Sequence, residues 1–271
     1  MVGGLKTVRL SPEKLTHLMV EDCLAARANP GRIAKTVFAA NGHAIALAAL
    51  DAGFRRMFED ADIVHADGQA SVFAAKIFTS TPIEGRSATT DFLHDAARAA
   101  ARAGLRFFLL GGTEEINRRC AQILKDTYPG LVIAGRRHGY FSIDEEESIC
   151  EEINRSGADV LWTGLSVPLE YEFATRNKHR LRAGWIVTCG GCFNFVTGDY
   201  ARAPSWMQAT GFEWLYRLAR EPKRLFWRYA VTNPVALMML LTRTAEIRQY
   251  PPLAASAPAP EHETLPGLRR A

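Results

Sequence analysis

The sequence has few of the features of exported, membrane-spanning or disulfide-bonded proteins. Its first residues, MVGGLKTVRL, do not contain the basic segment and apolar core of a secretory signal. The longest strongly apolar run near the C-terminus, residues 235–241, is far shorter than the roughly 20 residues that a spanning helix needs. An odd number of cysteines without an export signal argues against a disulfide framework; they are Cys23, Cys120, Cys150, Cys189 and Cys192. We therefore expect a cytoplasmic protein with reduced thiols and no transmembrane anchor.

The sequence also lacks the common motifs for metal ions and nucleotide cofactors. It contains no P-loop, no Asp-x-Asp and no zinc-type pair of cysteine pairs, so we expect neither a metal ion nor a cofactor. Cys189 and Cys192 form a CxxC motif, but no thioredoxin-like order of elements surrounds it, which disfavours redox chemistry. Gly111 and Gly112 do not belong to a GxGxxG pattern, so a nicotinamide oxidoreductase is a distant alternative.

What the sequence does contain is enough apolar material for a core and an excess of positive charge near its end. Hydrophobic residues make up 48% of the chain and charged residues 23%, which is typical of a globular protein. The formal net charge is +4, and arginine and lysine gather after residue 200. Such a cluster suits a partner that carries phosphates, either anionic lipid or nucleic acid, and charge alone leaves both open.

Short apolar runs rich in β-branched residues alternate with longer amphipathic runs, and this alternation predicts a parallel sheet covered by helices. The predicted strands span residues 34–39, 62–66, 105–110, 131–136, 159–163 and 185–188. The predicted helices span residues 44–59, 69–79, 90–103, 114–127, 145–156 and 169–181. We expect a Rossmann-like, mostly parallel α/β core over residues 1–203, a basic, aromatic, membrane-associating helical appendage over 204–249, and a disordered tail over 250–271.

Ligands of such folds bind beyond the carboxyl ends of the strands, so the polar residues there are candidates for chemistry. Asp67 follows a predicted strand, where its carboxylate is placed to take a proton from an incoming hydroxyl. An ordinary turn formed by Asp67 and Gly68 is the alternative interpretation. Residues 111–112 lie between a predicted strand and a predicted helix start, where free main-chain N–H groups bind phosphates. A structural tight turn is the alternative interpretation. His65 is interpreted as a packed core residue.

The appendage carries four arginines at helical spacing. They are Arg217, Arg220, Arg224 and Arg228, which an unbroken helix would place on one face. Pro222 is a potential start of a second helix, in which case the stripe divides between two helices. Interleaved aromatics such as Trp214 and Trp227 suit the headgroup layer of a bilayer. A solvated cationic face over a packed aromatic core is the other interpretation, and spacing leaves both open.

Several segments, in this order, resemble the WecG/TagA/CpsF family of bacterial glycosyltransferases over roughly residues 30 to 245. They are ADG at 66–68, EGRSATTD at 84–91, LLGG at 109–112, HGYF at 138–141, GLSVP at 164–168, GGCFNFVTGDYARAPSWM at 190–207 and EWLYRLAREPKRLFWRY at 213–229. The ordered set is specific, although no single member is.

The resemblance implies an inverting transfer of a sugar from a UDP donor to an undecaprenyl-diphosphate-linked saccharide in surface polysaccharide synthesis. Because the sequence lacks metal motifs, we expect this transfer to be metal-independent. It implies that Asp67 is the catalytic base, and that the arginine-rich appendage closes over the site and touches the inner face of the cytoplasmic membrane. The partners expected are the donor, the lipid-linked acceptor and an anionic membrane surface, with no nucleic acid. The residues expected to contact donor or acceptor are Asn41, Gly68, Arg86, Asp91, Gly111, Gly112, Glu170, Gly190, Gly191 and Asn194.

Some positions expected near the ligand depart from the family pattern. Ala39 replaces a common threonine, Thr89 a common glycine, and Asn194 a usual aspartate, while residues 169–171 read Leu-Glu-Tyr in place of Lys-Gln-Glu. Hydrogen-bonding groups dominate substrate discrimination, so these departures bear on the donor. They keep open a second hypothesis, a non-catalytic subunit that binds UDP-sugar at the membrane surface. The oligomeric state also stays open, with a homo-oligomer as one option.

Overall fold

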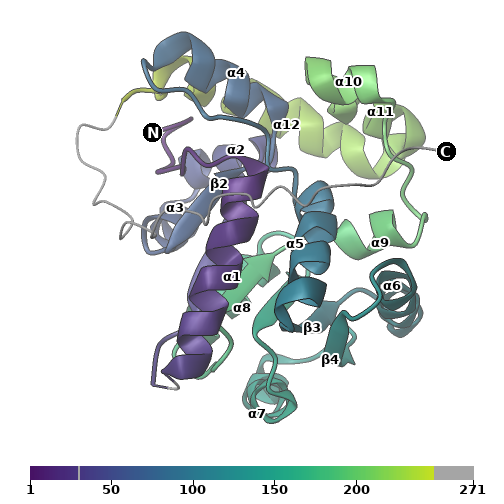
Figure 1. Cartoon of the computed structure of the whole chain (residues 1–271). Coiled ribbons are helices and arrows are strands. Elements are labelled where there is room, and N and C mark those ends of the chain that lie inside the picture. The colour runs from purple at the N-terminus through teal and green to yellow at the C-terminus, as the bar shows by residue number, and fades with distance from the viewer. Residues whose placement is uncertain (30, 247–271) are drawn as a thin grey trace, which may run out of the picture.

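A computed structural model describes residues 1–29 and 31–246 of the chain. One sheet of six parallel strands lies at its centre, in the order β2-β1-β6-β5-β3-β4 (Figure 1). The strands are β1 (Lys35–Ala40), β2 (Ile63–Ala66), β3 (Arg106–Gly111), β4 (Val132–Arg137), β5 (Val160–Gly164) and β6 (Trp185–Thr188). Their ends fall within one residue of the predicted ones, and the Rossmann-like parallel α/β fold is confirmed.

Helices cover both faces of the sheet, because successive side chains of each strand point to opposite sides. Val37 and Trp162 lie in one apolar core, whereas Phe38 and Leu161, their neighbours in sequence, lie in the other. The first core is closed by α1 (Pro12–Ala28), α5 (Thr89–Ala103), α6 (Glu114–Thr127) and α9 (Cys192–Val196). The second is closed by α2 (Gly42–Leu50), α3 (Ala52–Glu59), α4 (Gln69–Phe78), α7 (Glu146–Ser156) and α8 (Leu169–Asn177).

The order of the strands creates a switch point between β3 and β5. The connection after β3 runs through α6 to the outer strand β4, whereas the connection after β5 runs through α8 to β6, on the opposite side. The two loops therefore diverge at the carboxyl edge of the sheet, which is where open α/β sheets bind ligands.

Three helix predictions differ from the structure. The single helix predicted over residues 44–59 divides at Asp51, whose extended backbone and side chain, accepting from the N–H groups of Gly53 and Phe54, start α3. The helix predicted to run to residue 181 ends at Asn177. Helix α1 was not predicted, although Ser11 and Pro12 form a typical helix start in which the serine hydroxyl accepts from Lys14 N. A short 3-10 turn, Ile143–Glu145, precedes α7.

The appendage consists of α10 (Ser205–Thr210), α11 (Glu213–Arg220) and α12 (Pro222–Thr242), and the break between α11 and α12 lies at the predicted proline. Helix α12 packs along α2, and its Leu225, Ala236 and Leu240 are buried. Ala236 lies against Gly42, at the start of α2. The far half of α12 thus shares the core of the sheet domain, while the domain boundary at residue 203 stays a prediction.

Among the helices of the described residues, none has the length and apolarity to cross a bilayer. The tail predicted over residues 250–271 lies outside the described part of the chain.

Candidate active site

Asn41 and Asp67 are neighbours because they follow two paired strands. Ala40 of β1 and Ala66 of β2 lie side by side in the parallel register, so the next residue of each strand emerges at the same edge. The Asn41 Nδ2 atom donates to the Asp67 Oδ2 atom at 3.2 Å. Asn41 also caps α2, since its Oδ1 atom accepts from Ala44 N at 3.1 Å.

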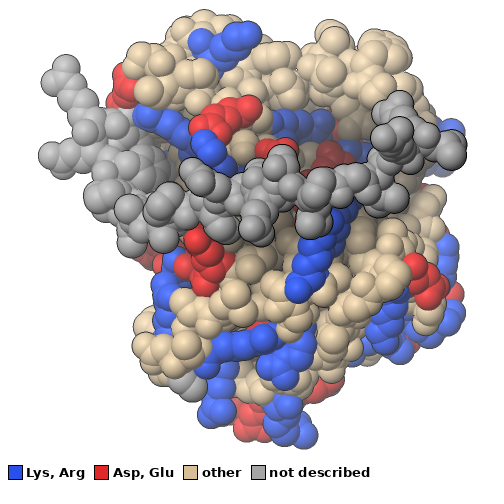
Figure 2. Space-filling view, in the orientation of Figure 1, with Lys and Arg blue, Asp and Glu red and all other residues tan. Residues whose placement is uncertain are grey.

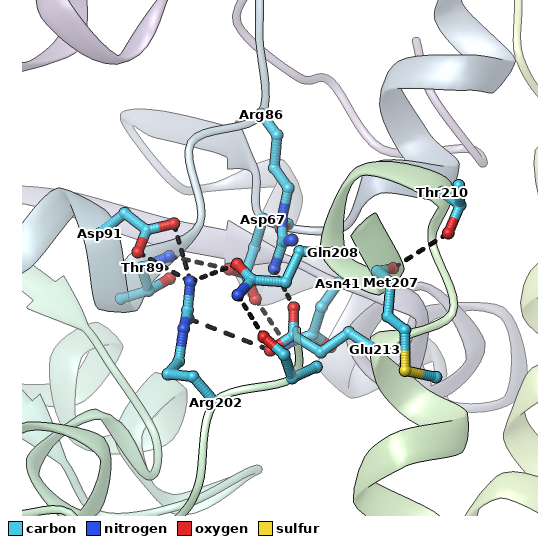
Figure 3. Close-up of polar contacts among 11 residues, drawn as sticks. Asn41, Asp67, Arg86, Thr89, Asp91, Arg202, Met207, Gln208, Thr210 and Glu213 are labelled. Carbon is cyan, nitrogen blue, oxygen red and sulfur yellow. Dashed lines mark hydrogen bonds and ion pairs between the residues drawn. The ribbon is translucent and has the colours of Figure 1, made fainter. Parts of the chain in front are cut away.

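Asp67 is further held by the loop before α5 and by the first residue of that helix (Figure 3). Its Oδ1 atom accepts from Thr89 N at 2.8 Å, and its main-chain oxygen accepts from the Arg86 Nε atom at 2.8 Å. Each carboxylate oxygen therefore has one neutral donor and retains a further lone pair for a substrate hydroxyl. Because Asp67 is only partly buried, a proton acceptor in a fixed orientation lies within reach of ligands at this edge.

Arg202 and two residues of the appendage, Gln208 and Glu213, complete this cluster, and the sequence did not reveal them. The Arg86 Nη2 atom donates to the Glu213 Oε2 atom at 2.6 Å. The Arg202 Nη2 atom donates to Asp91 Oδ1 at 2.8 Å and to Gln208 Oε1 at 2.7 Å (Figure 3). The one available signal was Glu213 itself, an acidic residue at the start of a strongly basic segment.

The glycines at 111–112 serve close packing at the switch point. Gly111 has a φ of +142°, and a Cβ atom there would lie 2.3 Å from the main-chain oxygen of Gly164 in the neighbouring strand. Gly112 N donates to the same oxygen at 3.1 Å. This N–H group is therefore already bonded within the protein, and a role of the pair in donor binding stays a prediction.

Glu170 lies beneath the glycine loop that follows β6. Its side chain is buried, with 2% of the residue exposed, and its Oε2 atom accepts from Gly190 N at 2.6 Å. Burial raises the pKa of this carboxyl from its ordinary 4.5 to about 8; the main-chain N–H of Gly190 opposes the shift, while the negative charge of Asp67 adds to it. Glu170 is thus mostly protonated at neutral pH and supports the glycine loop from within the core.

Further residues that the sequence singled out lie near the ends of β1 and β6. The Tyr171 hydroxyl donates to the main-chain oxygen of Ala39 at 2.9 Å, so the unusual residues at 39 and 171 contact each other. A Cβ atom on Gly191 would lie 3.1 Å from the Tyr200 ring. Asn194 lies in α9 and is partly buried. Contacts of Gly191 and Asn194 with a donor stay predictions.

The buried carboxyl predicts a specific pH dependence of stability. The folded-state pKa of Glu170 is raised, so between pH 4.5 and about 8 the folded protein binds one more proton than the unfolded chain. The free energy of unfolding therefore falls as the pH rises through that window. We expect Glu170→Gln to remove this loss, on the order of a few kcal/mol or roughly 5–10 °C in Tm at pH 9. Thermal melts from pH 6 to 9 test this. Glu172→Gln, on the same helix, is the matched control, and equal slopes in both variants would contradict the assignment.

The four arginines of the appendage do not share one environment. Arg217 lies 5.3 Å from the centre of the Phe195 ring, and Arg224 lies 5.3 Å from that of Tyr200. Arg228 is half-buried; burial lowers the pKa of its guanidinium, and the charges of Arg224 and Arg217 lower it further. Arg220 is exposed. Arg217, Arg224 and Arg228 therefore gather beside the segment after β6, although Arg224 is also exposed, and Arg220 has no such neighbour among the ring contacts of the described residues.

The arginine cluster extends to the start of α2. Burial lowers the pKa of His43 to about 4, and the positive charge of Arg228 contributes to the same shift. Glu221 partly balances the cluster through an ion pair with Arg224 at 2.6 Å. A neutral imidazole and mutually repelling guanidinium groups beside a helix N-terminus make this a favourable place for an anion.

The residues interpreted as structural from the sequence are structural. His65 is buried, its Nδ1 atom lies 3.0 Å from the main-chain oxygen of Ser87, and burial lowers its pKa. All five cysteines are buried and free. Burial raises the pKa of Cys189 and Cys192 well above the ordinary value, which suppresses the reactive thiolate. In the described part of the chain, no three His, Cys, Asp or Glu side chains lie together in a way that could hold a metal ion.

Comparison of the sequence with known proteins identifies the family of this chain. The model of the "Glycosyl transferase WecG/TagA/CpsF family" matches residues 2–250. An N-acetylglucosaminyldiphosphoundecaprenol N-acetyl-beta-D-mannosaminyltransferase of Bacillus subtilis (strain 168) is 25% identical over 209 residues, which are 77% of this chain and 80% of the relative. A protein of the same name from Bacillus spizizenii is 26% identical over 181 residues, covering 67% of this chain and 68% of that one.

Proposed function

Because the chain belongs to the WecG/TagA/CpsF family of glycosyl transferases, we propose that it moves a sugar from a UDP-sugar to a saccharide on undecaprenyl diphosphate. The two relatives are named for an acceptor of this kind, N-acetylglucosaminyldiphosphoundecaprenol, and for transfer of N-acetylmannosamine. The single observation that carries the proposal is the fixed carboxylate of Asp67 at the carboxyl edge of the sheet. It is hydrogen-bonded to Asn41, two residues before His43, which feels the charge of Arg228.

The proposed chemistry is a direct displacement at the sugar carbon. Asp67 removes the proton of the acceptor hydroxyl as the oxygen attacks, and the bond to UDP breaks on the opposite face, so the configuration inverts. The departing diphosphate carries the developing negative charge. Arg217, Arg224 and Arg228 supply the positive charge that stabilises it, a role that a metal ion fills in other transferases, and we therefore propose a metal-independent reaction.

We further propose that the enzyme sits on the inner face of the cytoplasmic membrane, where such acceptors are made into surface polysaccharide. Its candidate membrane face joins the appendage to α4, because Gly211 lies against Phe73 of α4. Figure 2 shows few charged side chains on the surface over α4 and α10, at the top of the view. Ile77 on α4 is 71% exposed and Trp227 on α12 is 74% exposed, and the exposed Arg220 adds positive charge for anionic headgroups.

Substitutions on this face test the membrane contact. Deleting the appendage is unsuitable, because it would strip buried side chains of α12 from the core. We expect Ile77→Ala and Trp227→Ala each to weaken sedimentation with anionic liposomes about fivefold, since partial insertion of each side chain contributes about 1 kcal/mol. Ile143→Ala is the control, because Ile143 is 64% exposed but lies beside α7, far from α4 (Figure 1). Equal losses in all three variants would rule out this face.

A donor screen tests the function itself. UDP-hexosamines, UDP-uronic acids and UDP-glucose are each mixed with the protein and a short-chain lipid-diphosphate N-acetylglucosamine, and mass spectrometry records the added sugar. The expected result is one product with release of UDP. The alternative function, a non-catalytic UDP-sugar-binding subunit, is favoured by the altered residues at 39, 169 and 194. Calorimetric binding of a UDP-sugar without turnover across the panel would support that alternative.

A further inference from the structure

A carboxylate of the appendage reaches into the cluster around the proposed base. Glu213 is the first residue of α11, and its Oε2 atom lies 2.6 Å from the Arg86 Nη2 atom. Both side chains are largely withdrawn from water, with 17% of the Arg86 side chain and 16% of the Glu213 side chain exposed. A second guanidinium, that of Arg202, places its Nη1 atom 4.0 Å from the Glu213 Oε1 atom. Glu213 therefore lies between two arginines, one before α5 and one before α10 (Figure 3).

Arg86 joins this carboxylate directly to the loop of Asp67. Its Nη2 atom binds Glu213 and its Nε atom binds the main-chain oxygen of Asp67. Because Nε and Nη2 lie on the same edge of the rigid guanidinium plane, the two contacts orient each other. Without the negative charge of Glu213, the guanidinium of Arg86 would be held more weakly, and its contact with the Asp67 carbonyl would loosen.

The same short segment carries the second contact to the base. Three residues after Arg86, Thr89 N donates to Asp67 Oδ1. Ser87 N donates to the main-chain oxygen of Ala66, which keeps the segment on the sheet independently of Glu213. Loss of Glu213 should therefore loosen the orientation of Asp67 without unfolding the domain.

We propose that Glu213 is a positioning residue that couples the seating of the appendage to the orientation of the Asp67 carboxylate. The proposal rests on the proposed transferase function. It means that the base is oriented most firmly while α11 lies over the site, because Arg86 is fixed from both sides only in that arrangement. The lipid-facing appendage and the chemistry at the end of β2 are then linked through one ion pair between residues 127 positions apart.

Glu213→Gln tests the coupling with little change in size. We expect kcat to fall about tenfold while KM for the donor changes less than twofold, because the substituted residue orients the base and does not hold the donor. In an Arg86→Ala background the same substitution should cause no additional loss, since its effect passes through Arg86. Glu115→Gln, which removes an exposed carboxylate from an ion pair on α6, is the matched control for charge.

Three kinetic outcomes would overturn the proposal. They are an unchanged kcat in Glu213→Gln, full additivity with Arg86→Ala, and a higher kcat with a lower donor KM, which would make Glu213 an internal competitor of the substrate. Hydrogen exchange separates this test from the fate of the proposed function, because it needs no turnover. The amide of Thr89 should exchange faster in Glu213→Gln than in the parent protein, and equal rates overturn the proposal even if no donor is ever transferred.

Discussion

Replacing Asp67 by asparagine is expected to lower sugar transfer at least about a hundredfold while the domain stays folded. General-base assistance typically contributes ~10²–10⁴-fold, and the amide cannot accept the acceptor's proton. The substitution also turns one of two hydrogen bonds into a donor–donor contact, since the carboxylate accepts from both Asn41 Nδ2 and Thr89 N. A loss of stability of about 1–3 kcal/mol should accompany the loss of transfer. Initial rates and thermal melts of the purified variant measure the two effects.

A swap of the two side chains separates the chemical from the structural effect. Combining Asp67→Asn with Asn41→Asp restores an acceptor opposite the new amide, and an aspartate at the start of α2 still caps Ala44 N. Stability should return toward that of the parent protein, whereas transfer should stay at least about a hundredfold lower, because the carboxylate now follows β1. Near-normal transfer by the single variant would remove Asp67 from the mechanism, and recovery in the double variant would show that its position is not critical.

Replacing Arg228 by glutamine is expected to lower transfer about 10–100-fold even with a water-soluble acceptor analogue. Charge-assisted hydrogen bonds contribute about 1.5–3 kcal/mol, and this half-buried guanidinium, repelled by Arg217 and Arg224, gains most from an anionic diphosphate. Binding to anionic liposomes should be almost unchanged. Rates with the soluble acceptor and liposome sedimentation provide the two measurements.

Arg220→Gln is the matched comparison, because Arg220 is exposed on the neighbouring helix. With the soluble acceptor it should transfer as well as the parent protein, and its liposome binding should weaken, more clearly at low salt than at high salt. If Arg228→Gln instead weakened only liposome binding, the inner arginines would contact lipid headgroups and the proposed diphosphate site would be wrong.

Local sequence patterns were enough to predict the sheet and the first half of the site. Apolar β-branched runs such as residues 160–164 form strands wherever they are buried on both faces, and their ends were placed to within one residue. Once the strands were placed, Asn41 and Asp67 were expected at the same edge of the sheet, because each lies just after its strand. The helices were less certain at their ends, where a single capping side chain such as Asp51 decides the break.

The tertiary structure alone decided how the appendage meets the site. The contact between Arg86 and Glu213 joins residues 127 positions apart, and neither side chain has a local signature that identifies its partner. The arginine stripe was visible as a spacing. Only the break between α11 and α12 and the packing of α12 on α2 determined that Arg228 is half-buried while Arg220, on α11, is exposed. Hydrophobic periodicity and strand ends are local properties of the chain, so the sequence by itself determined the strands, the fold class and the position of Asp67, the proposed base. Pairing between distant charges depends on how whole elements dock, and therefore only the folded molecule reveals which charges hold the base and which face outward.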